Sequence, residues 1–136
     1  GDILKDTFKG IPVIFEDHVI FTDYYRKLQS LNADFAVIPL GDDEFNRCKT
    51  FQKYLEFSQF KIPVIVGNSP VYTDIIEQDA TGLISYNHAD WLENFDILVN
   101  NQNNDREEIG ENANAYSKEW SFENEKHIEN LKTIFQ

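Results

Sequence analysis

The chain has 136 residues, of which 41% are hydrophobic and 26% charged, the balance of a single globular domain with enough apolar material for one core. Acidic residues outnumber basic ones by 24 to 12, so the formal net charge is −12. A surface of that sign repels phosphate backbones and anionic lipid, so we expect no nucleic-acid partner and no adhesion to a membrane surface. It does not exclude a local basic site that holds an anion.

Cysteine usage and hydropathy indicate a cytoplasmic protein. Cys48 is the only cysteine, so no intrachain disulfide can form and a cysteine-ligated zinc site is not expected. No apolar run approaches the roughly 20 residues that a membrane helix needs, so we expect no transmembrane segment. The first residues carry no signal-peptide pattern. The chain contains no methionine, which suggests a segment excised from a longer protein.

Short apolar runs alternate with longer amphipathic ones as far as residue 86. The apolar runs predict strands, and apolar residues spaced three and four apart predict helices. In chain order the expected elements are a strand at 11–15, a helix at 22–31, a strand at 34–40, a polar loop at 41–49, a helix at 50–60, a strand at 62–66, a turn at 67–70, a short helix at 72–78 and a strand at 82–86.

The C-terminal third carries signals for the start of three more helices. Asp90 with Glu93, and Asp105 with Glu108, have the spacing of a capping box, and Ser121 is a favourable N-cap residue. The expected elements are a helix from Asp90 to about 99, a loop at 100–104, a helix from Asp105 to about 117 and a helix from Ser121 to about 135.

Strands that alternate with helices imply right-handed crossovers and a parallel sheet. The strand runs are almost entirely apolar, which is typical of strands buried on both faces. We therefore expect an α/β fold, a Rossmann-like doubly wound parallel sheet of about four strands flanked by helices, with further helices at the C-terminus. Residues 1–136 are expected to form one domain.

Ligands of open parallel sheets bind beyond the carboxyl ends of the strands, where three loops qualify here. These loops are 16–21, 41–49 and 67–71. The second is the richest, because Arg47, Lys49 and the Thr50 hydroxyl precede a predicted helix whose N-terminus favours a phosphate. This pattern indicates a diphosphate site. The alternative is that the two cations only balance the acidic triplet 42–44.

Glu56 follows Lys49 by seven residues, which is two helical turns. On a continuous helix both side chains, with Lys53 between them, would share a face away from the apolar stripe of Phe51 and Leu55. A carboxylate there could accept hydrogen bonds from ribose hydroxyls while Lys49 reaches phosphate. The alternative is an ordinary surface ion pair between Lys53 and Glu56.

Other groupings favour ordinary structural roles. The run Asp42–Glu44 could bind a divalent cation, but a solvated acidic loop is the more common arrangement, and we assign no metal site. Cys48 precedes a predicted helix, where a thiol becomes more acidic, yet a small buried filler is the preferred interpretation. No glycine-rich dinucleotide fingerprint is present, and no cofactor is expected.

The order of these motifs resembles the C-terminal, donor-binding domain of family-4 glycosyltransferases of the GT-B fold, over roughly residues 11–135. The segments that carry the resemblance are Ala33-Asp34, Pro39-Leu40, Lys49-Thr50, Lys53-Tyr54-Leu55-Glu56-Phe57, Ile62-Pro63-Val64-Ile65, Ser69-Pro70-Val71-Tyr72, Gly82-Leu83-Ile84, Asp90-Trp91 and Ile109-Gly110-Glu111-Asn112-Ala113.

The resemblance implies roles for individual residues. Glu56 matches the second of the family's paired glutamates, which binds the donor ribose. The first would fall at Cys48, so Asn46, Lys49 and Thr50 would have to contact the donor sugar or phosphate instead. The loop that contains Ser69 would lie near the sugar or the diphosphate.

Two parts of the family pattern are missing. The opening strand and helix that carry an Arg and a Lys for the diphosphate do not occur before Ile11, and the N-terminal acceptor-binding domain is absent. In the family the last helix crosses onto that domain, and an apolar stripe of Ile128, Leu131 and Phe135 would fit such docking, although core packing explains it equally well.

The resemblance thus implies an incomplete hexosyltransferase-type enzyme that binds a UDP-, GDP- or similar nucleotide-sugar donor. It would transfer the sugar to an acceptor hydroxyl in polysaccharide or glycoconjugate biosynthesis, with the N-terminal domain as partner. The sequence identifies no catalytic residue. The alternative function is a non-catalytic α/β binding or regulatory module that has kept the fold.

Overall fold

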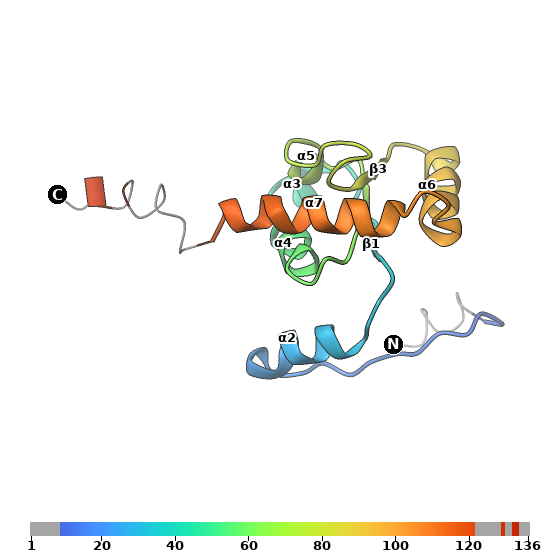
Figure 1. Ribbon diagram of the computed structural model, residues 1–136, viewed down its shortest axis with the longest axis horizontal. Helices are drawn as coiled ribbons and strands as arrows, with labels where there is room; N and C mark the ends of the chain where they lie inside the picture. Colours follow the sequence, from blue (N-terminus) through green and yellow to red (C-terminus); the bar gives the residue numbers. More distant parts are fainter. Residues whose placement is uncertain (1–8, 122–128, 130–131, 134–136) are drawn as a thin grey trace. The chain divides into compact units, whose positions relative to one another are not determined.

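The computed structural model describes residues 9–121, 129 and 132–133 (Figure 1). The chain falls into two compact units, Gly1–Leu31 and Asn32–Gln136, and each is described by itself. The helix predicted from Ser121 to about 135, with its stripe of Ile128, Leu131 and Phe135, lies outside the continuously described residues.

In the first unit, helix α2 (Phe21–Ser30) confirms the helix predicted at 22–31. Asp23 lies in its first turn and Lys27 in its last, the placement that the helix dipole favours. Lys27 also forms a 2.7 Å ion pair with Glu16.

The strand predicted at 11–15 is wrong. These residues have no regular secondary structure, and Ile14 is 85% exposed. An apolar run forms a strand only when its backbone N–H and C=O groups pair with a neighbouring strand, and Pro12 has no N–H to contribute. The loop at 16–21 therefore does not follow a strand, although a place after a strand is the reason for expecting it among the ligand-binding loops.

The larger unit is built on a three-stranded parallel sheet in the order β1-β2-β3. Strand β1 (Ala36–Ile38) pairs with β2 (Val64–Gly67), and β2 pairs with β3 (Leu83–Ser85). The strands predicted at 34–40, 62–66 and 82–86 and their parallel direction are thus confirmed. The described residues form three strands rather than the expected four or so, because 11–15 does not join the sheet.

Both faces of the sheet are covered, so β2 is buried along its whole length. Val64 and Val66 join the apolar cluster around Tyr54 on one face. Ile65 points to the opposite face, where it packs with Leu98. This burial explains why the strand runs are continuously apolar instead of alternating.

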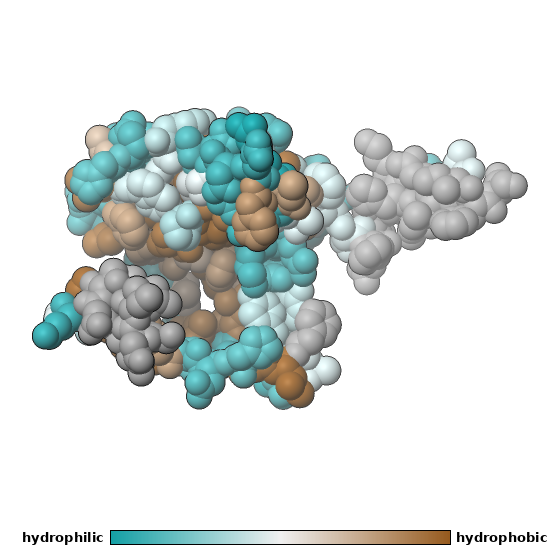
Figure 2. Space-filling view, turned by 180° about the vertical axis from the view of Figure 1, so that it is seen from behind, coloured by the Kyte–Doolittle hydropathy of each residue, from teal (hydrophilic) through white to brown (hydrophobic). Residues whose placement is uncertain are grey.

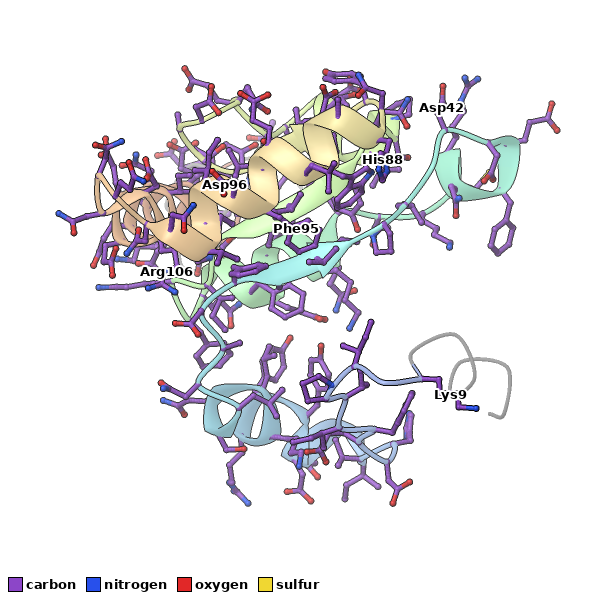
Figure 3. The ribbon with its side chains drawn as sticks, turned by 90° about the vertical axis from the view of Figure 1, so that its right-hand side faces the viewer. Lys9, Asp42, His88, Phe95, Asp96 and Arg106 are labelled. Atoms are coloured by element: carbon purple, nitrogen blue, oxygen red, sulfur yellow. The ribbon has the colours of Figure 1, made fainter. Side chains whose placement is uncertain are left out.

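Helices from three parts of the chain supply these two clusters. Helix α4 (Gln52–Ser58) packs against α7 (Asp105–Glu119), and both contribute to the cluster around Tyr54. Helix α6 (His88–Asn100) lies over the other face. Figure 3 shows Phe95 of α6 turned toward the sheet, where its ring packs edge-on against Phe35 at 5.9 Å between centroids.

Two short helices differ from the predicted elements. Helix α3 (Glu44–Arg47) interrupts the loop predicted at 41–49, because the Asp43 carboxylate accepts a hydrogen bond from the Asn46 N–H and caps it. Helix α5 (Pro70–Thr73) begins earlier than the predicted start at 72, because proline is well suited to a first helical turn.

The predicted capping boxes are displaced. Helix α6 is capped by Asn87, whose side chain accepts from the N–H groups of Ala89 and Asp90, while Asp90 accepts from the N–H of Tyr86. Asp105 is the first residue of α7 rather than its cap, since Asn104 takes that position with a left-handed φ of 60°.

Gly67 ends β2 at a point where the backbone after β1 leaves no space for a side chain. A Cβ at Gly67 would overlap the Leu40 carbonyl oxygen and lie 2.9 Å from the carbonyl carbon. Backbone atoms cannot move aside as the end of a long side chain can, so this glycine fixes how closely the loops after β1 and β2 approach each other.

We predict that Gly67→Ala lowers the free energy of unfolding by about 2–3 kcal/mol, since the methyl group would force β1 and β2 apart. Gly41→Ala is the matched control, because a Cβ at Gly41 would meet nothing within 4 Å. Its effect should stay within about 0.5 kcal/mol. Urea unfolding of both variants measures the difference, and an equal loss in the two would contradict this account of Gly67.

Candidate functional site

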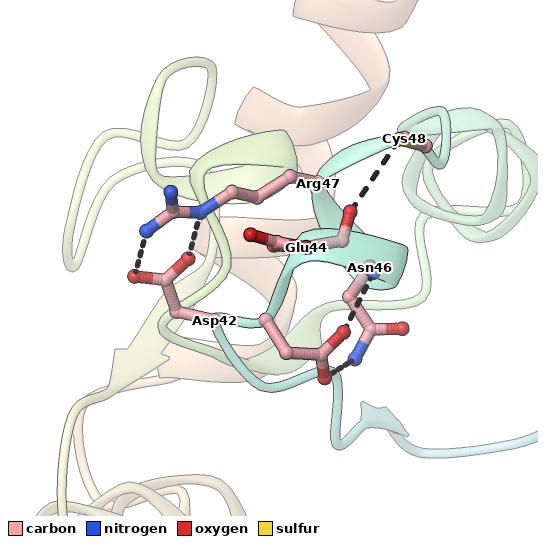
Figure 4. A network of polar contacts seen from close by, with 6 residues as sticks. Asp42, Glu44, Asn46, Arg47 and Cys48 are labelled. Atoms are coloured by element: carbon pink, nitrogen blue, oxygen red, sulfur yellow. Dashed lines mark hydrogen bonds and ion pairs between the residues drawn. The ribbon is translucent and has the colours of Figure 1, made fainter.

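The loop after β1 carries a network of polar contacts, drawn in Figure 4. The Arg47 guanidinium donates two hydrogen bonds to the Asp42 carboxylate, at 2.5 Å from Nε and 2.9 Å from Nη2. The Asn46 side-chain amide donates to Asp43 at 2.6 Å. These contacts hold the loop in a compact turn around α3.

The network engages two of the predicted donor-binding residues. Hydrogen bonds from Arg47 lower the pKa of Asp42, and the same contact raises the pKa of Arg47. The charge of Arg47 is thus balanced inside the loop. For this cation the structure agrees with the alternative interpretation, in which the basic residues only balance the acidic triplet 42–44. Nε and Nη2 point at Asp42, so a phosphate could be met only by the remaining N–H groups of Arg47, whose charge Asp42 already balances.

Lys49 and Thr50 precede α4 instead of lying on it, because that helix begins at Gln52. The prediction that Lys49 and Glu56 share one helix face is therefore wrong. Both Lys49 and Thr50 are exposed. The Lys49 ammonium lies over the Phe45 ring, 4.8 Å from its centroid, an arrangement that stabilises the cation only weakly when solvent can reach it.

Glu56 differs most from its predicted setting. Its side chain is only 7% exposed, although the helical pattern placed it on an outer face. The Lys53 ammonium lies 2.9 Å from Oε2, and the Gln52 amide donates to Oε1 at 3.0 Å. A buried carboxylate needs such partners, because removing its charge from water without them would destabilise the fold by roughly several kcal/mol.

Tyr72 of α5 is influenced by both charges of this pair. The residue is 2% exposed, and burial raises the pKa of its hydroxyl. The Lys53 ammonium lowers that pKa and the Glu56 carboxylate raises it, so both charges act on the Tyr72 side chain. Tyr72 follows β2 in the chain, so the charges of α4 act on a residue of the segment beyond the carboxyl end of the central strand.

Sequence reasoning did not assign Gln52 or Lys53 to the ligand, and it placed Tyr72 near the ligand only as part of the loop that contains Ser69. Gln52 and Lys53 stand one turn before Glu56, a spacing at which helical side chains meet, so this signal was available. Tyr72 could not be recognised in this way, because its proximity to Glu56 depends on how α5 packs.

Ser69 is the other predicted site residue beyond β2. It is fully buried, and its hydroxyl has no hydrogen-bond partner among the described residues. Its carbonyl oxygen accepts from the N–H groups of Tyr72 and Thr73, so the residue begins α5 through its backbone and not through its side chain. A buried hydroxyl in this condition is uncommon and costs free energy.

Cys48 is exposed, so the interpretation as a buried filler is wrong. Its thiol lies 3.4 Å from the Glu44 carbonyl oxygen, which it contacts as a weak donor. Within the described part of the chain, no three His, Cys, Asp or Glu side chains converge as a metal site would require.

A cavity of about 530 Å³ lies at the free edge of β3, away from Glu56. Its lining includes five acidic residues and no Lys or Arg: Asp79, Asp90, Glu93, Asp96 and Asp105. A phosphate would be repelled there, so we do not place a nucleotide in this cavity. Figure 2 shows hydrophilic residues over much of the visible side of the larger unit, as its acidic composition leads one to expect.

Two side chains close the edge of β3 beside this cavity. The Gln78 amide oxygen accepts from the Ile84 N–H at 2.7 Å, and the buried Asn94 amide donates to the Ile84 carbonyl at 3.1 Å. They satisfy the groups that a fourth strand would otherwise pair with, so this edge is protected from strand addition.

No family model, curated protein or solved structure matches this chain. None of the helices in the described residues combines the length and the apolar character needed to cross a bilayer.

The charges of Lys53 and Glu56 predict how the pKa of the Tyr72 hydroxyl responds to substitutions. Lys53→Met should raise the pKa of Tyr72 further, because a nearby positive charge is lost, and Glu56→Gln should lower it, because a negative charge is lost. Carbon NMR of tyrosine labelled at Cζ would follow both variants. Tyr54 is the internal control, since its raised pKa depends on burial and on Thr81, Ser58 and Tyr116. Equal responses of the two tyrosines would contradict the proximity.

Proposed function

We propose that the larger unit is the donor-binding half of a glycosyltransferase, holding a nucleotide-diphosphate sugar for transfer to an acceptor hydroxyl in polysaccharide or glycoconjugate synthesis. The three-stranded parallel sheet would then be part of a Rossmann-like doubly wound fold. The N-terminal acceptor-binding domain would supply the general base that deprotonates the acceptor hydroxyl.

The observation that carries the proposal is the buried Glu56 carboxylate. It lies on α4, and its charge acts on Tyr72, which follows the carboxyl end of β2, the edge at which open parallel sheets bind ligands. Both Glu56 oxygens already accept hydrogen bonds, from Gln52 and Lys53. Two vicinal ribose hydroxyls offer the same pair of donors, so they could replace these contacts without leaving the carboxylate unsatisfied.

The remaining predicted residues would act around the sugar and diphosphate. Lys49 and Thr50 are exposed next to α4 and would require only side-chain rotation to reach a ligand. Asn46 and Arg47 would contribute through the side-chain N–H groups that their contacts with Asp43 and Asp42 leave over, or after exchanging these contacts. The Ser69 hydroxyl, unpartnered among the residues that the structure describes, would gain a hydrogen-bond partner if the segment before α5 opened.

A second candidate function is a non-catalytic α/β module. The bidentate contact of Arg47 with Asp42 favours it, because a cation already neutralised within its own loop contributes less to binding a diphosphate. Nucleotide binding by the purified chain separates the two functions.

We expect calorimetric titration with UDP, GDP and CDP to detect binding of one nucleotide, and Glu56→Ala to weaken it at least about tenfold, since two hydrogen bonds to a charged group would be lost. Glu111→Ala is the matched control, because Glu111 is also paired with a lysine but is exposed on α7. Absence of binding to the folded chain, or equal loss in the two variants, would reject the donor site at Glu56.

A further inference from the structure

The ion pair between Lys53 and Glu56 is unequal in exposure. The Glu56 side chain is 7% exposed, whereas that of Lys53 is 54% exposed, although the two charged groups lie 2.9 Å apart. Gln52, which contacts the other oxygen of Glu56, is exposed as well. Glu56 is thus held from the solvent side by two flexible side chains of the first turn of α4.

Other cations near this edge of the sheet are arranged differently. Arg47 is held by two hydrogen bonds to Asp42, and Lys49 lies over the Phe45 ring outside the helix. Lys53 contacts Glu56, the carboxylate that we propose to bind the ribose. In a nucleotide the diphosphate is attached to the 5′ carbon of the ribose. It would therefore lie within the length of a lysine side chain from the ribose hydroxyls that donate hydrogen bonds to Glu56.

We propose that Lys53 is a diphosphate-binding residue that exchanges partners: it neutralises Glu56 in the empty site and turns to the donor diphosphate when ribose hydroxyls take its place on the carboxylate. This inference rests on the proposed function and extends it by naming a residue that sequence reasoning had not assigned to the ligand.

The exchange keeps every charged group partnered. A ribose hydroxyl replaces the ammonium as donor to Oε2, and the ammonium gains phosphate oxygens, which bind it as strongly as a carboxylate does. Lysine suits such a change better than arginine, because its ammonium is a compact charge on a flexible stem and needs no planar bidentate partner. The effect of both charges on Tyr72 places that ring beside the exchange.

The mechanism has a distinct binding signature. A ligand with a ribose but no phosphate displaces Lys53 from Glu56 and offers its ammonium no phosphate oxygens, whereas a nucleoside diphosphate offers them. Removing the charge of Lys53 should therefore weaken the diphosphate and spare the nucleoside. A merely structural role for Lys53 would weaken both ligands equally.

The test measures dissociation constants for uridine, guanosine and cytidine and for their 5′-diphosphates, by NMR titration of the full chain. In Lys53→Met the matching diphosphate should bind about tenfold more weakly, from the loss of one charge-assisted contact. The nucleoside should bind as well as before or better. Lys53→Arg, which keeps the charge, should recover most of the affinity for the diphosphate.

Lys61→Met is the matched control, because Lys61 is likewise 53% exposed and paired with a glutamate, Glu111. It should leave both affinities unchanged. Thermal unfolding of each variant checks that the chain remains folded. If the single variant unfolds, the double variant Lys53→Met with Glu56→Gln also removes the buried negative charge that Lys53 had neutralised. The double variant should bind the nucleoside diphosphate no better than the nucleoside.

The outcomes separate the two proposals. If no nucleoside diphosphate binds the unmodified chain, the donor-site function fails and the partner exchange fails with it. If one binds and Glu56→Ala weakens it, but Lys53→Met changes diphosphate and nucleoside affinity by the same factor or changes neither, the donor site stands and the exchange is rejected.

Discussion

The burial of β2 on both faces is the constraint on which the larger unit depends. Val64 and Val66 anchor the cluster shared by α4 and α7, and Ile65 anchors the one beneath α6. Because β2 pairs with a strand on either side, its backbone groups are satisfied within the sheet, and its side chains supply apolar area to two layers at once. The segment that follows β2 is placed by these contacts, so the effect of the Glu56 charge on Tyr72 is a consequence of core packing.

A buried carboxylate in such a small domain needs an explanation. Glu56 occupies a helix position where an apolar side chain would add to the core, and it requires Lys53 and Gln52 to remain charged there. Only the carboxylate of this pair is buried, since Lys53 is half-exposed, and replacing a buried charge by an apolar side chain often increases stability, so folding alone does not explain Glu56. The buried Ser69 hydroxyl, which has no partner within the described part of the chain, is a second polar group near the start of α5 that packing alone does not explain.

The loop after β1 has the opposite character. Its charges are exposed, and Asp42, Asp43, Asn46 and Arg47 are paired with one another over a few residues. Exposed pairs of this kind contribute little stability. Their main effect is to order the turn that leads from β1 into α4. The richest run of polar residues in the sequence is therefore mostly engaged with itself, and the functional interest moves to α4 and α5.

Continuous apolar runs and helical spacing report directly on burial and period, so the three paired strands, their parallel direction and the approximate helices of the larger unit could be predicted from the sequence. The sequence also predicted Glu56 and Ser69 as site residues, through a resemblance for which no comparison found a match, and these two assignments stay predictions. That 11–15 forms no strand could be learned only from the tertiary structure, since pairing depends on a neighbouring strand and not on composition. Packing likewise decided that Glu56 is buried, that Lys49 precedes α4 and that Arg47 is paired with Asp42, because each depends on where helices begin and which surfaces meet.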